Sequence, residues 1–226
     1  MNNLAILYCA SGPSTELDLS LEKIRNCVVG DYHVYIKLLP SEEAQDFKKK
    51  IEAEKVTVII ENDVGVYDGW NQLLCICKGT HVVFLGEGDW VHLNTDNLTN
   101  HLNYLTSVMY DQRGIHNVIN RKVKTPLRRF GTLHGAIIFP LSCFEAATEN
   151  LRYDIKYKIA ADVDLICALV KSYNFKWCAI SGYHYVKIGG VSAVNQAQGL
   201  EEVVQIYERY YGFKLLWQIW KKILLK

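Results

Sequence analysis

Short apolar runs alternate with amphipathic stretches in the first quarter of the chain. Runs at 4–8, 33–39 and 56–60 have the length of buried strands. A charged stretch at 41–54, with Ser41 as its N-cap, predicts a surface helix. The positions that recur at helical spacing between the first two runs are Leu17, Leu21, Ile24 and Val28. This β-α-β-α-β order predicts a mostly parallel sheet that is covered by helices and joined by right-handed crossovers.

The most informative stretch is 79–90, where an apolar run stops abruptly. The run from Val82 to Leu85 is typical of a strand buried on both faces of a parallel sheet. It is followed by two glycines, which let the backbone approach a ligand closely, and by Glu87 and Asp89, which supply hard oxygen ligands. Ligands of open α/β sheets bind at the carboxyl ends of strands. An acidic turn whose aspartate only caps a helix is the alternative.

Three further elements follow from the same reading. A helix is expected at about 67–77, with Asp68 in its first turn, where stabilisation of the helix dipole is the alternative to a ligand contact. Asp96 is expected to cap a helix that runs to Met109. A second strongly apolar strand is predicted at 136–139.

Two aspartates open an amphipathic helix that is predicted at 158–170. Asp162 and Asp164 are two residues apart, so their side chains diverge by about 200° and at most one of them can face a shared site. Asp162 is the better candidate because it lies at the helix entry, where an N-cap role is compatible with a functional one. His134 precedes the 136–139 strand, and a packed or hydrogen-bonded histidine is there the alternative to a ligand.

The last predicted strands lead into a glycine-bearing loop. Strands are expected at 175–180 and 183–188, and the Gly-Gly-Val-Ser loop at 189–192 follows them. Lys187 and His184 lie just upstream, and exposed N–H groups beside a cation suit a pyrophosphate. An ordinary turn is the alternative.

The C-terminal region predicts a helix at 200–211 and then an amphipathic one at 213–226. One face of the second helix gathers Leu215, Leu216, Ile219, Trp220, Ile223 and Leu224. The other face carries Lys214, Gln218, Lys221 and Lys222. This composition indicates a helix lying in a membrane interface, although docking on its own domain or on a partner would bury the same residues.

Composition limits the class of protein. The chain has 226 residues, of which 50% are apolar, so we expect one domain with appendages. A formal charge of +1 gives no electrostatic case for binding nucleic acid. The 7 cysteines form no Cys-x-x-Cys pair and indicate reduced thiols of a cytosolic protein. The start has no basic region of a signal peptide, and no run approaches the roughly 20 apolar residues that span a bilayer.

Five segments of the sequence follow one another in a specific order. They are 61–71, 78–90, 134–140, 153–165 and 189–192. The series, within 56–192, resembles the family 2 glycosyltransferases of bacterial surface-polysaccharide synthesis, particularly the colanic-acid type. The resemblance implies an α/β GT-A fold: a Rossmann-like, mostly parallel sheet flanked by helices. It divides the chain into a glycosyltransferase domain at 1–198 and C-terminal helices at 199–226. The donor half of that domain would span about 1–110 and the acceptor half about 111–198.

The resemblance also implies an inverting, metal-dependent transfer of a sugar. Asp89, with Glu87, matches the metal-binding acidic motif and would hold Mg²⁺ or Mn²⁺ against the donor diphosphate. Asp162 matches the general base that takes the proton of the acceptor hydroxyl. The donor-binding positions are Glu61, Asp63, Asp68, Asn71, Gly189, Gly190 and Ser192. Acceptor or phosphate contacts are expected from His134, Lys187 and His184.

The acceptor implied is a growing, lipid-linked glycan, which places the protein in the cytoplasm at the inner face of the membrane. Two departures from the family pattern matter. Gly135 replaces the Gln of a His-Gln pair, and 38–43 lacks the Asp that commonly serves the nucleobase. The donor is therefore left open between UDP-, GDP- and dTDP-sugars.

Two other readings stay open. The first is a non-catalytic binding protein with an eroded donor site that acts through its tail. The second is an unrelated doubly wound nucleotide-binding domain, for which Ser11-Gly-Pro-Ser is a poor phosphate loop.

Overall fold

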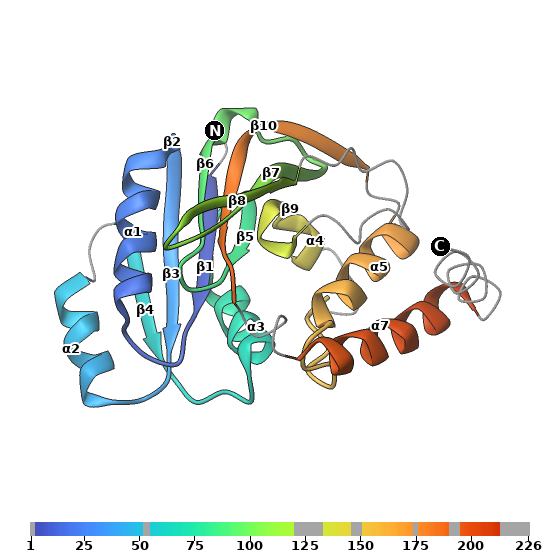
Figure 1. Cartoon of the computed structure of the whole chain (residues 1–226), viewed down its shortest axis with the longest axis horizontal. Coiled ribbons are helices and arrows are strands. Elements are labelled where there is room, and N and C mark those ends of the chain that lie inside the picture. Colours follow the sequence, from blue (N-terminus) through green and yellow to red (C-terminus); the bar gives the residue numbers. More distant parts are fainter. Residues whose placement is uncertain are drawn as a thin grey trace.

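A ten-stranded mixed sheet forms the middle layer of the protein (Figure 1). This computed structural model describes residues 3–51, 55–119, 133–145, 151–173, 176–189 and 195–212. The strands are β1 (Asn3–Cys9), β2 (Val28–Val29), β3 (Asp31–Leu38), β4 (Val56–Ile60), β5 (His81–Leu85), β6 (Trp90–Asn94), β7 (Leu102–Asp111), β8 (Gly114–Ile119), β9 (Ile137–Pro140) and β10 (Trp177–Lys187). The strand order is β2-β6-β10-β7-β9-β5-β1-β3-β4, with β8 paired to β7.

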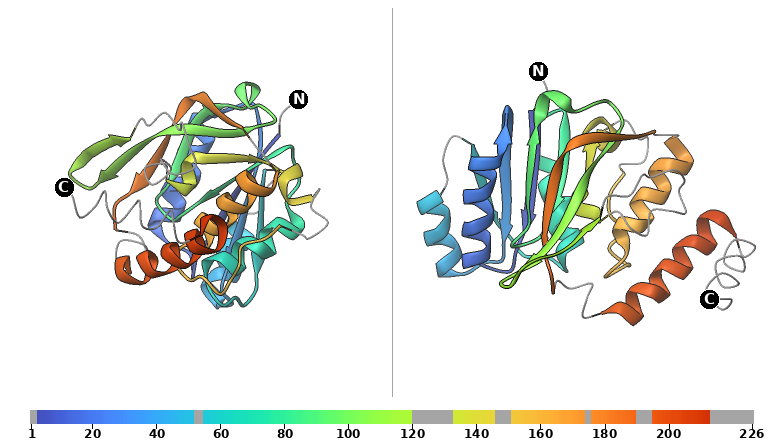
Figure 2. Two further views of the ribbon diagram at one scale, coloured as in Figure 1. Left: turned by 90° about the vertical axis from the view of Figure 1, so that its right-hand side faces the viewer. Right: turned by 45° about the horizontal axis from the view of Figure 1, so that its top comes forward.

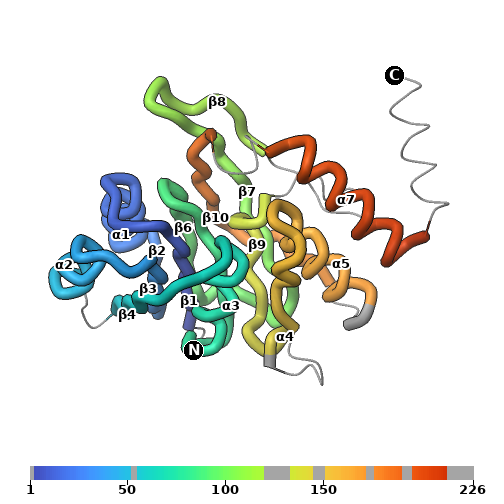
Figure 3. The backbone as a smooth tube through the Cα atoms, turned by 90° about the horizontal axis from the view of Figure 1, so that it is seen from below, coloured from blue at the N-terminus to red at the C-terminus, as the bar shows by residue number. Residues whose placement is uncertain are grey.

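The half of the sheet built from the first strands is parallel, as the sequence predicts. β5, β1, β3 and β4 are parallel neighbours. β9 runs antiparallel between β5 and β7, so that β7 and its parallel partner β10 point the same way as β5. The carboxyl ends of β1, β3, β4, β5, β7 and β10 therefore meet at one edge, which we call the carboxyl edge. Figure 3 views the molecule from the side where this edge lies.

Helices cover both faces of the sheet (Figure 2). They are α1 (Thr15–Cys27), α2 (Glu42–Ile51), α3 (Val66–Ile76), α4 (Ser142–Glu145), α5 (Ala161–Tyr173) and α7 (Gln196–Tyr211). One apolar core lies between the sheet and α1 with α2, and a second lies between the sheet and α3 with α5. α7 packs outside α5 through the buried residues Ile206 and Tyr207. The arrangement confirms an α/β fold with helices on both faces of the sheet.

The caps of the first helices follow the sequence. The Ser14 hydroxyl accepts the Leu17 N–H at the start of α1, at 3.1 Å. The Ser41 hydroxyl accepts the Ala44 N–H at 3.0 Å, which confirms its predicted N-cap role at α2. Each cap satisfies one N–H that has no partner inside its helix.

The helix expected from Asp96 to Met109 is wrong. A single 3-10 turn, η1 (Thr95–Asn97), is capped by the Asn94 side chain and ends at Leu98 in extended backbone. The chain then forms β7, which is paired on both sides, and these ladders override the helical spacing of its leucines. The strands expected at 175–180 and 183–188 are one strand, β10, with an irregular register between Ala179 and Tyr183.

Two expectations concern membranes. In the part of the chain that the structure describes, no helix is long and apolar enough to cross a bilayer. The amphipathic stretch 213–226 lies outside the described residues.

Candidate active site

The acidic loop after β5, residues 86–89, is held from four sides at the carboxyl edge. The Tyr8 hydroxyl of β1 donates to the Asp89 carbonyl oxygen at 2.6 Å. The Gly88 N–H donates to the Ser20 hydroxyl of α1 at 3.1 Å, and the Tyr110 hydroxyl of β7 donates to the Gly88 carbonyl. The Lys187 N–H at the end of β10 donates to Asp89 Oδ1 at 2.9 Å. The loop is therefore fixed before any ligand binds.

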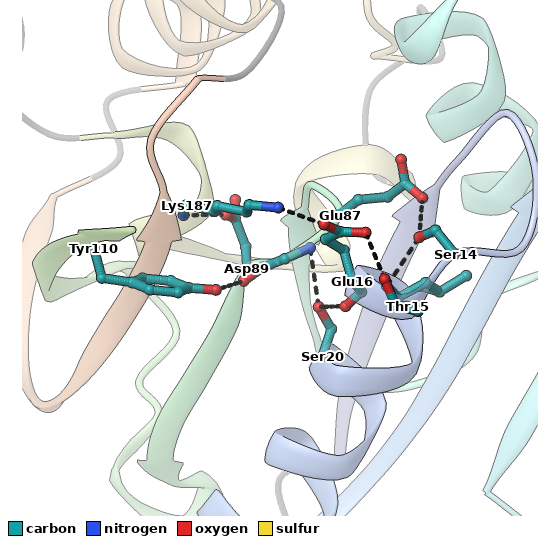
Figure 4. Close-up of polar contacts among 10 residues, drawn as sticks. Ser14, Thr15, Glu16, Ser20, Glu87, Asp89, Tyr110 and Lys187 are labelled. Carbon is teal, nitrogen blue, oxygen red and sulfur yellow. Dashed lines mark hydrogen bonds and ion pairs between the residues drawn. The ribbon is translucent and has the colours of Figure 1, made fainter. Parts of the chain in front are cut away.

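Lys187 crosses directly over this loop (Figure 4). Gly88 has a φ of 84°, and a Cβ built there would lie 2.8 Å from Lys187 Cδ. Only glycine accepts both the positive φ and the close approach of the Lys187 side chain, which explains why position 88 is a glycine. The Lys187 ammonium ion-pairs with Glu16 of α1 at 2.6 Å. This ion pair lowers the pKa of Glu16 below its ordinary value.

Glu87 and Asp89 point in different directions (Figure 4). The exposed Glu87 carboxylate accepts the Ser14 hydroxyl at 2.7 Å, whereas Asp89 faces the end of β10. A hollow of about 300 Å³ opens beside Gly88. It is lined by Thr15, Glu16, Leu19, Gly88, Tyr110, Asp111, Gln112 and Lys187. The acidic loop thus has free space on the side of α1.

His184 lies behind Asp89 with a buried imidazole. Its side chain is 1% exposed, and neither ring nitrogen has a hydrogen-bond partner among the residues that the structure describes. Nε2 lies 3.7 Å from Asp89 Oδ2. A Cβ at Gly135 would lie 2.6 Å from the same nitrogen, so the His184 ring fills the space that a side chain at position 135 would need.

One of the predicted donor acids, Asp63, pairs with a lysine that the sequence analysis missed. Lys37, fully buried at the end of β3, ion-pairs with Asp63. Burial lowers the pKa of Lys37 below its ordinary value. Asp63 Oδ1 also accepts the Gly65 N–H at 2.8 Å, and Asp68 Oδ2 accepts the Val64 N–H at 3.1 Å. Both acids therefore shape the loop between β4 and α3.

The other predicted donor residues lie in different settings. Glu61 is exposed at the end of β4. The Asn71 amide exchanges two hydrogen bonds of 2.9 Å with the backbone of Tyr153, so it links α3 to the chain that precedes α5. Gly189 is exposed, with a φ of 109°. Gly190 and Ser192 lie outside the described residues.

Asp162 lies in a different environment from Asp89. Its Oδ1 is 3.2 Å from the Tyr67 hydroxyl, whose single proton can be donated either to it or to the Ile159 carbonyl at 2.7 Å. Burial raises the pKa of Asp162 to about 6. Asp164 points away and ion-pairs with Arg209 of α7 at 3.3 Å. The two carboxylates therefore point to different surroundings, as their spacing on the helix predicts.

An aromatic cluster separates Asp162 from His134. The Tyr67 and Tyr153 rings are stacked with centroids 5.3 Å apart. The Tyr153 hydroxyl and His134 Nε2 are hydrogen-bonded at 2.9 Å. Burial first, and then the neighbouring His184, lower the pKa of His134 to about 3, so this imidazole is neutral near pH 7. His134 is therefore a packed, hydrogen-bonded residue.

The donor atoms for a metal ion are few. Within the described ranges, no group of three His, Cys, Asp or Glu side chains is placed to hold a metal ion. A carboxylate has about four acceptor sites. Each Asp89 oxygen accepts one backbone N–H, from Gly86 and from Lys187, so each oxygen keeps one acceptor site for a further ligand. Asp89 alone fits a hard cation, and Glu87 does not join it in this structure.

Solved structures share this fold. The chain matches S. aureus TarS 1–349 in complex with UDP at a TM-score of 0.60 and 17% identity, covering 94% of this chain and 72% of that one. It matches the complex of TarS 1–349 with UDP-GlcNAc at 0.65 and 14%, covering 84% and 59%. A longer TarS chain matches at 0.63 and 15%, covering 91% of this chain and only 43% of the longer one.

The likeness shows the fold. This chain has the GT-A-like fold of TarS, which confirms that part of the expectation from sequence. The colanic-acid subtype stays a prediction. No family model matches the chain, and no curated protein matches it in sequence.

The residues that sequence reasoning missed all act through contacts between distant segments. Lys37 left a signal, since it is a lysine inside an apolar strand. Tyr67 and Tyr153 reach Asp162 and His134 from segments far apart in the chain, and Glu16 reaches Lys187 across 171 positions. No spacing in the sequence predicts these pairs.

Proposed function

We propose that this protein is an inverting glycosyltransferase that moves a sugar from a nucleotide-sugar to a hydroxyl of a growing glycan. The observation that carries the proposal is the pairing of two aspartates in a GT-A-like fold. Asp89 lies in a fixed loop at the carboxyl edge, and Asp162 lies at the entry of α5 with a desolvated carboxyl next to Tyr67. TarS, whose solved complexes contain UDP and UDP-GlcNAc, is a family 2 glycosyltransferase. The donor proposed is therefore a UDP-sugar.

Asp162 is the proposed general base. Inversion requires an acceptor oxygen that attacks the anomeric carbon opposite the leaving diphosphate while it loses a proton. A carboxylate with a pKa of about 6 is ionised at pH 7 and is a stronger base than an ordinary aspartate. Tyr67 beside it holds the carboxylate in place without neutralising it.

Asp89 is the proposed anchor for the diphosphate end of the donor. A Mg²⁺ or Mn²⁺ ion held there would neutralise charge that develops on the leaving nucleoside diphosphate. Lys187 contributes a second positive charge at the same place, and Asp63 and Asp68 shape the loop on the nucleoside side. Lipid-linked glycans of surface polysaccharides are the proposed acceptors, with 213–226 as the contact to the membrane surface.

Calorimetric titration with UDP tests the donor end directly. We expect UDP to bind in the presence of Mn²⁺, to bind much more weakly with EDTA, and to lose its metal-dependent affinity in Asp89→Ala. Asp96→Ala is the matched control because Asp96 is exposed on η1, away from the acidic loop. GDP and dTDP titrations show whether uracil is selected.

Two outcomes would change the proposal. Equal UDP affinity in Asp89→Ala and in the wild type would remove Asp89 from its role. If no nucleotide binds to folded protein, with or without metal, the non-catalytic reading replaces the enzymatic one.

A further inference from the structure

A buried carboxylate on α7 holds the chain just ahead of Asp162. Glu202 is 7% exposed. Its two oxygens accept the backbone N–H groups of Lys158, Ile159 and Ala160 at 2.9, 2.9 and 2.8 Å. The Gln198 side chain donates to the same carboxylate at 2.9 Å. Burial alone would raise the pKa of Glu202, but these four donors outweigh it, and the pKa lies below its ordinary value.

The three N–H groups lie at the entry of α5, which begins at Ala161. Ala160 directly precedes the helix, and a negative charge at this end of a helix is favoured by its dipole. A charged acceptor also forms stronger hydrogen bonds than a neutral one. Glu202 therefore fixes this turn from a helix that begins 35 positions after Ala161, at Gln196.

The same turn sets the position of the proposed base. Ile159 presents the carbonyl that accepts the Tyr67 hydroxyl at 2.7 Å, and Asp162 follows two residues after Ala160. The next turn of α5 is also tied to α7, through the ion pair between Asp164 and Arg209. α7 thus contacts the chain both before and after Asp162 in the sequence.

We infer that Glu202 is a positioning residue for Asp162: it fixes the 158–160 turn so that Asp162 faces Tyr67 and the acceptor. This role rests on the proposed function, in which Asp162 is the general base.

The negative charge of Glu202 also acts on the pKa of Asp162. Burial is the largest cause of the raised pKa, and the Glu202 charge raises it as well. The Tyr67 hydroxyl from α3 and the N–H groups of Val163 and of Asp162 itself lower that pKa. Loss of the Glu202 charge is therefore expected to lower the pKa of Asp162.

The test compares Glu202→Gln with Glu201→Gln, its exposed neighbour on the same helix. Carbon-13 NMR of the full chain measures the pKa of the Asp162 carboxyl, and hydrogen exchange measures protection of the three amides. We expect a lower Asp162 pKa and faster exchange in Glu202→Gln only. UDP release from UDP-GlcNAc is expected to slow by about tenfold to a hundredfold, with UDP affinity unchanged.

Each result has a distinct meaning. An unchanged Asp162 pKa and unchanged exchange in Glu202→Gln would overturn the positioning role. If both change while Asp162→Asn keeps full turnover, the contact stands and the assignment of the base fails. If Glu202→Gln does not fold, Glu202→Asp replaces it, because it keeps the charge and shortens the reach. Faster exchange without a fall in the Asp162 pKa is then expected, and protection like that of the wild type would refute the role.

Discussion

Asp89 and Asp162 have the same side chain in opposite surroundings. Asp89 is bound by backbone N–H groups, with the charged Lys187 crossing its loop, and it is partly open to solvent. Asp162 faces tyrosines, and its carboxyl is desolvated. The backbone donors fix the orientation of the Asp89 carboxylate, whereas desolvation raises the pKa of Asp162 and makes it a better proton acceptor. In the proposed function, the difference suits cation binding at Asp89 and proton transfer at Asp162.

The variant with the largest expected effect is Asp162→Asn, which tests the role of Asp162 separately from that of Asp89. We expect turnover to fall by about a hundredfold or more, because an amide cannot accept the proton. UDP affinity should stay near the wild-type value. Steady-state kinetics of UDP release and calorimetry measure the two quantities, and Asp96→Asn, on the exposed turn η1, is the control. Full turnover in Asp162→Asn would remove Asp162 from the role of general base.

Gly135→Ala tests the contact that links Asp89 to the segment at His134. His184 touches both Asp89 and the backbone beside His134, and the added methyl group would lie 2.6 Å from its Nε2. We expect a loss of about 1–3 kcal/mol in the free energy of unfolding, measured with urea. Gly12→Ala is the control, since no atom of the described part of the chain lies within 4 Å of a Cβ there. Equal stability of the two variants would show that the His184 ring is free to move.

Tyr67→Phe tests how the Tyr67 hydroxyl affects the pKa of Asp162, the proposed base. The base works only when it is deprotonated, so wild-type turnover should fall as the pH drops through about 6. The Tyr67 hydroxyl lowers the pKa of Asp162, so its loss should move this acid limb to higher pH. A pH profile of turnover measures the shift. An acid limb that moves to lower pH would mean that Tyr67 does not donate to Asp162.

The smallest effect is expected at Lys187, which already has Glu16 as a partner. Lys187→Gln should weaken UDP binding by about threefold to tenfold. The effect is small because an ion pair between a partly exposed lysine and a phosphate contributes little to the free energy of binding. Asp162 is not involved, so the acid limb should stay in place. Lys78→Gln, at the amino end of β5, is the control in the same calorimetry. UDP affinity unchanged in Lys187→Gln would remove it from the phosphate contacts.

Much of the fold could be predicted because its local patterns agree with its tertiary contacts. The strands at 4–8 and 56–60 and the cap at Ser41 needed no knowledge of their neighbours. The stretch 98–109 could not be predicted, since its leucines fit a helix and only pairing with β10 and β9 makes it a strand.

Some features of the candidate site could be predicted from the sequence and others could not. The acidic loop and the helix that carries Asp162 can be recognised from the sequence alone. The turn that Glu202 holds and the ion pair of Lys37 depend on folded neighbours, as does the fit of His184 against Gly135. Asn71 is an example: the sequence predicts a donor contact, whereas in this structure its amide forms two hydrogen bonds with the backbone of Tyr153.

The anchoring of α5 by α7 has a consequence for dissecting the chain. A fragment that stops at residue 198 would keep Asp89, Asp162 and their aromatic neighbours, but it would lack Glu202 and leave three backbone N–H groups without their acceptor. Such a truncation is expected to separate the two halves of the chemistry: it would still recognise a nucleotide, but it would turn over poorly. The end of α7 at Tyr211, not the last residue of the sheet, is then the smallest sensible boundary for a working fragment.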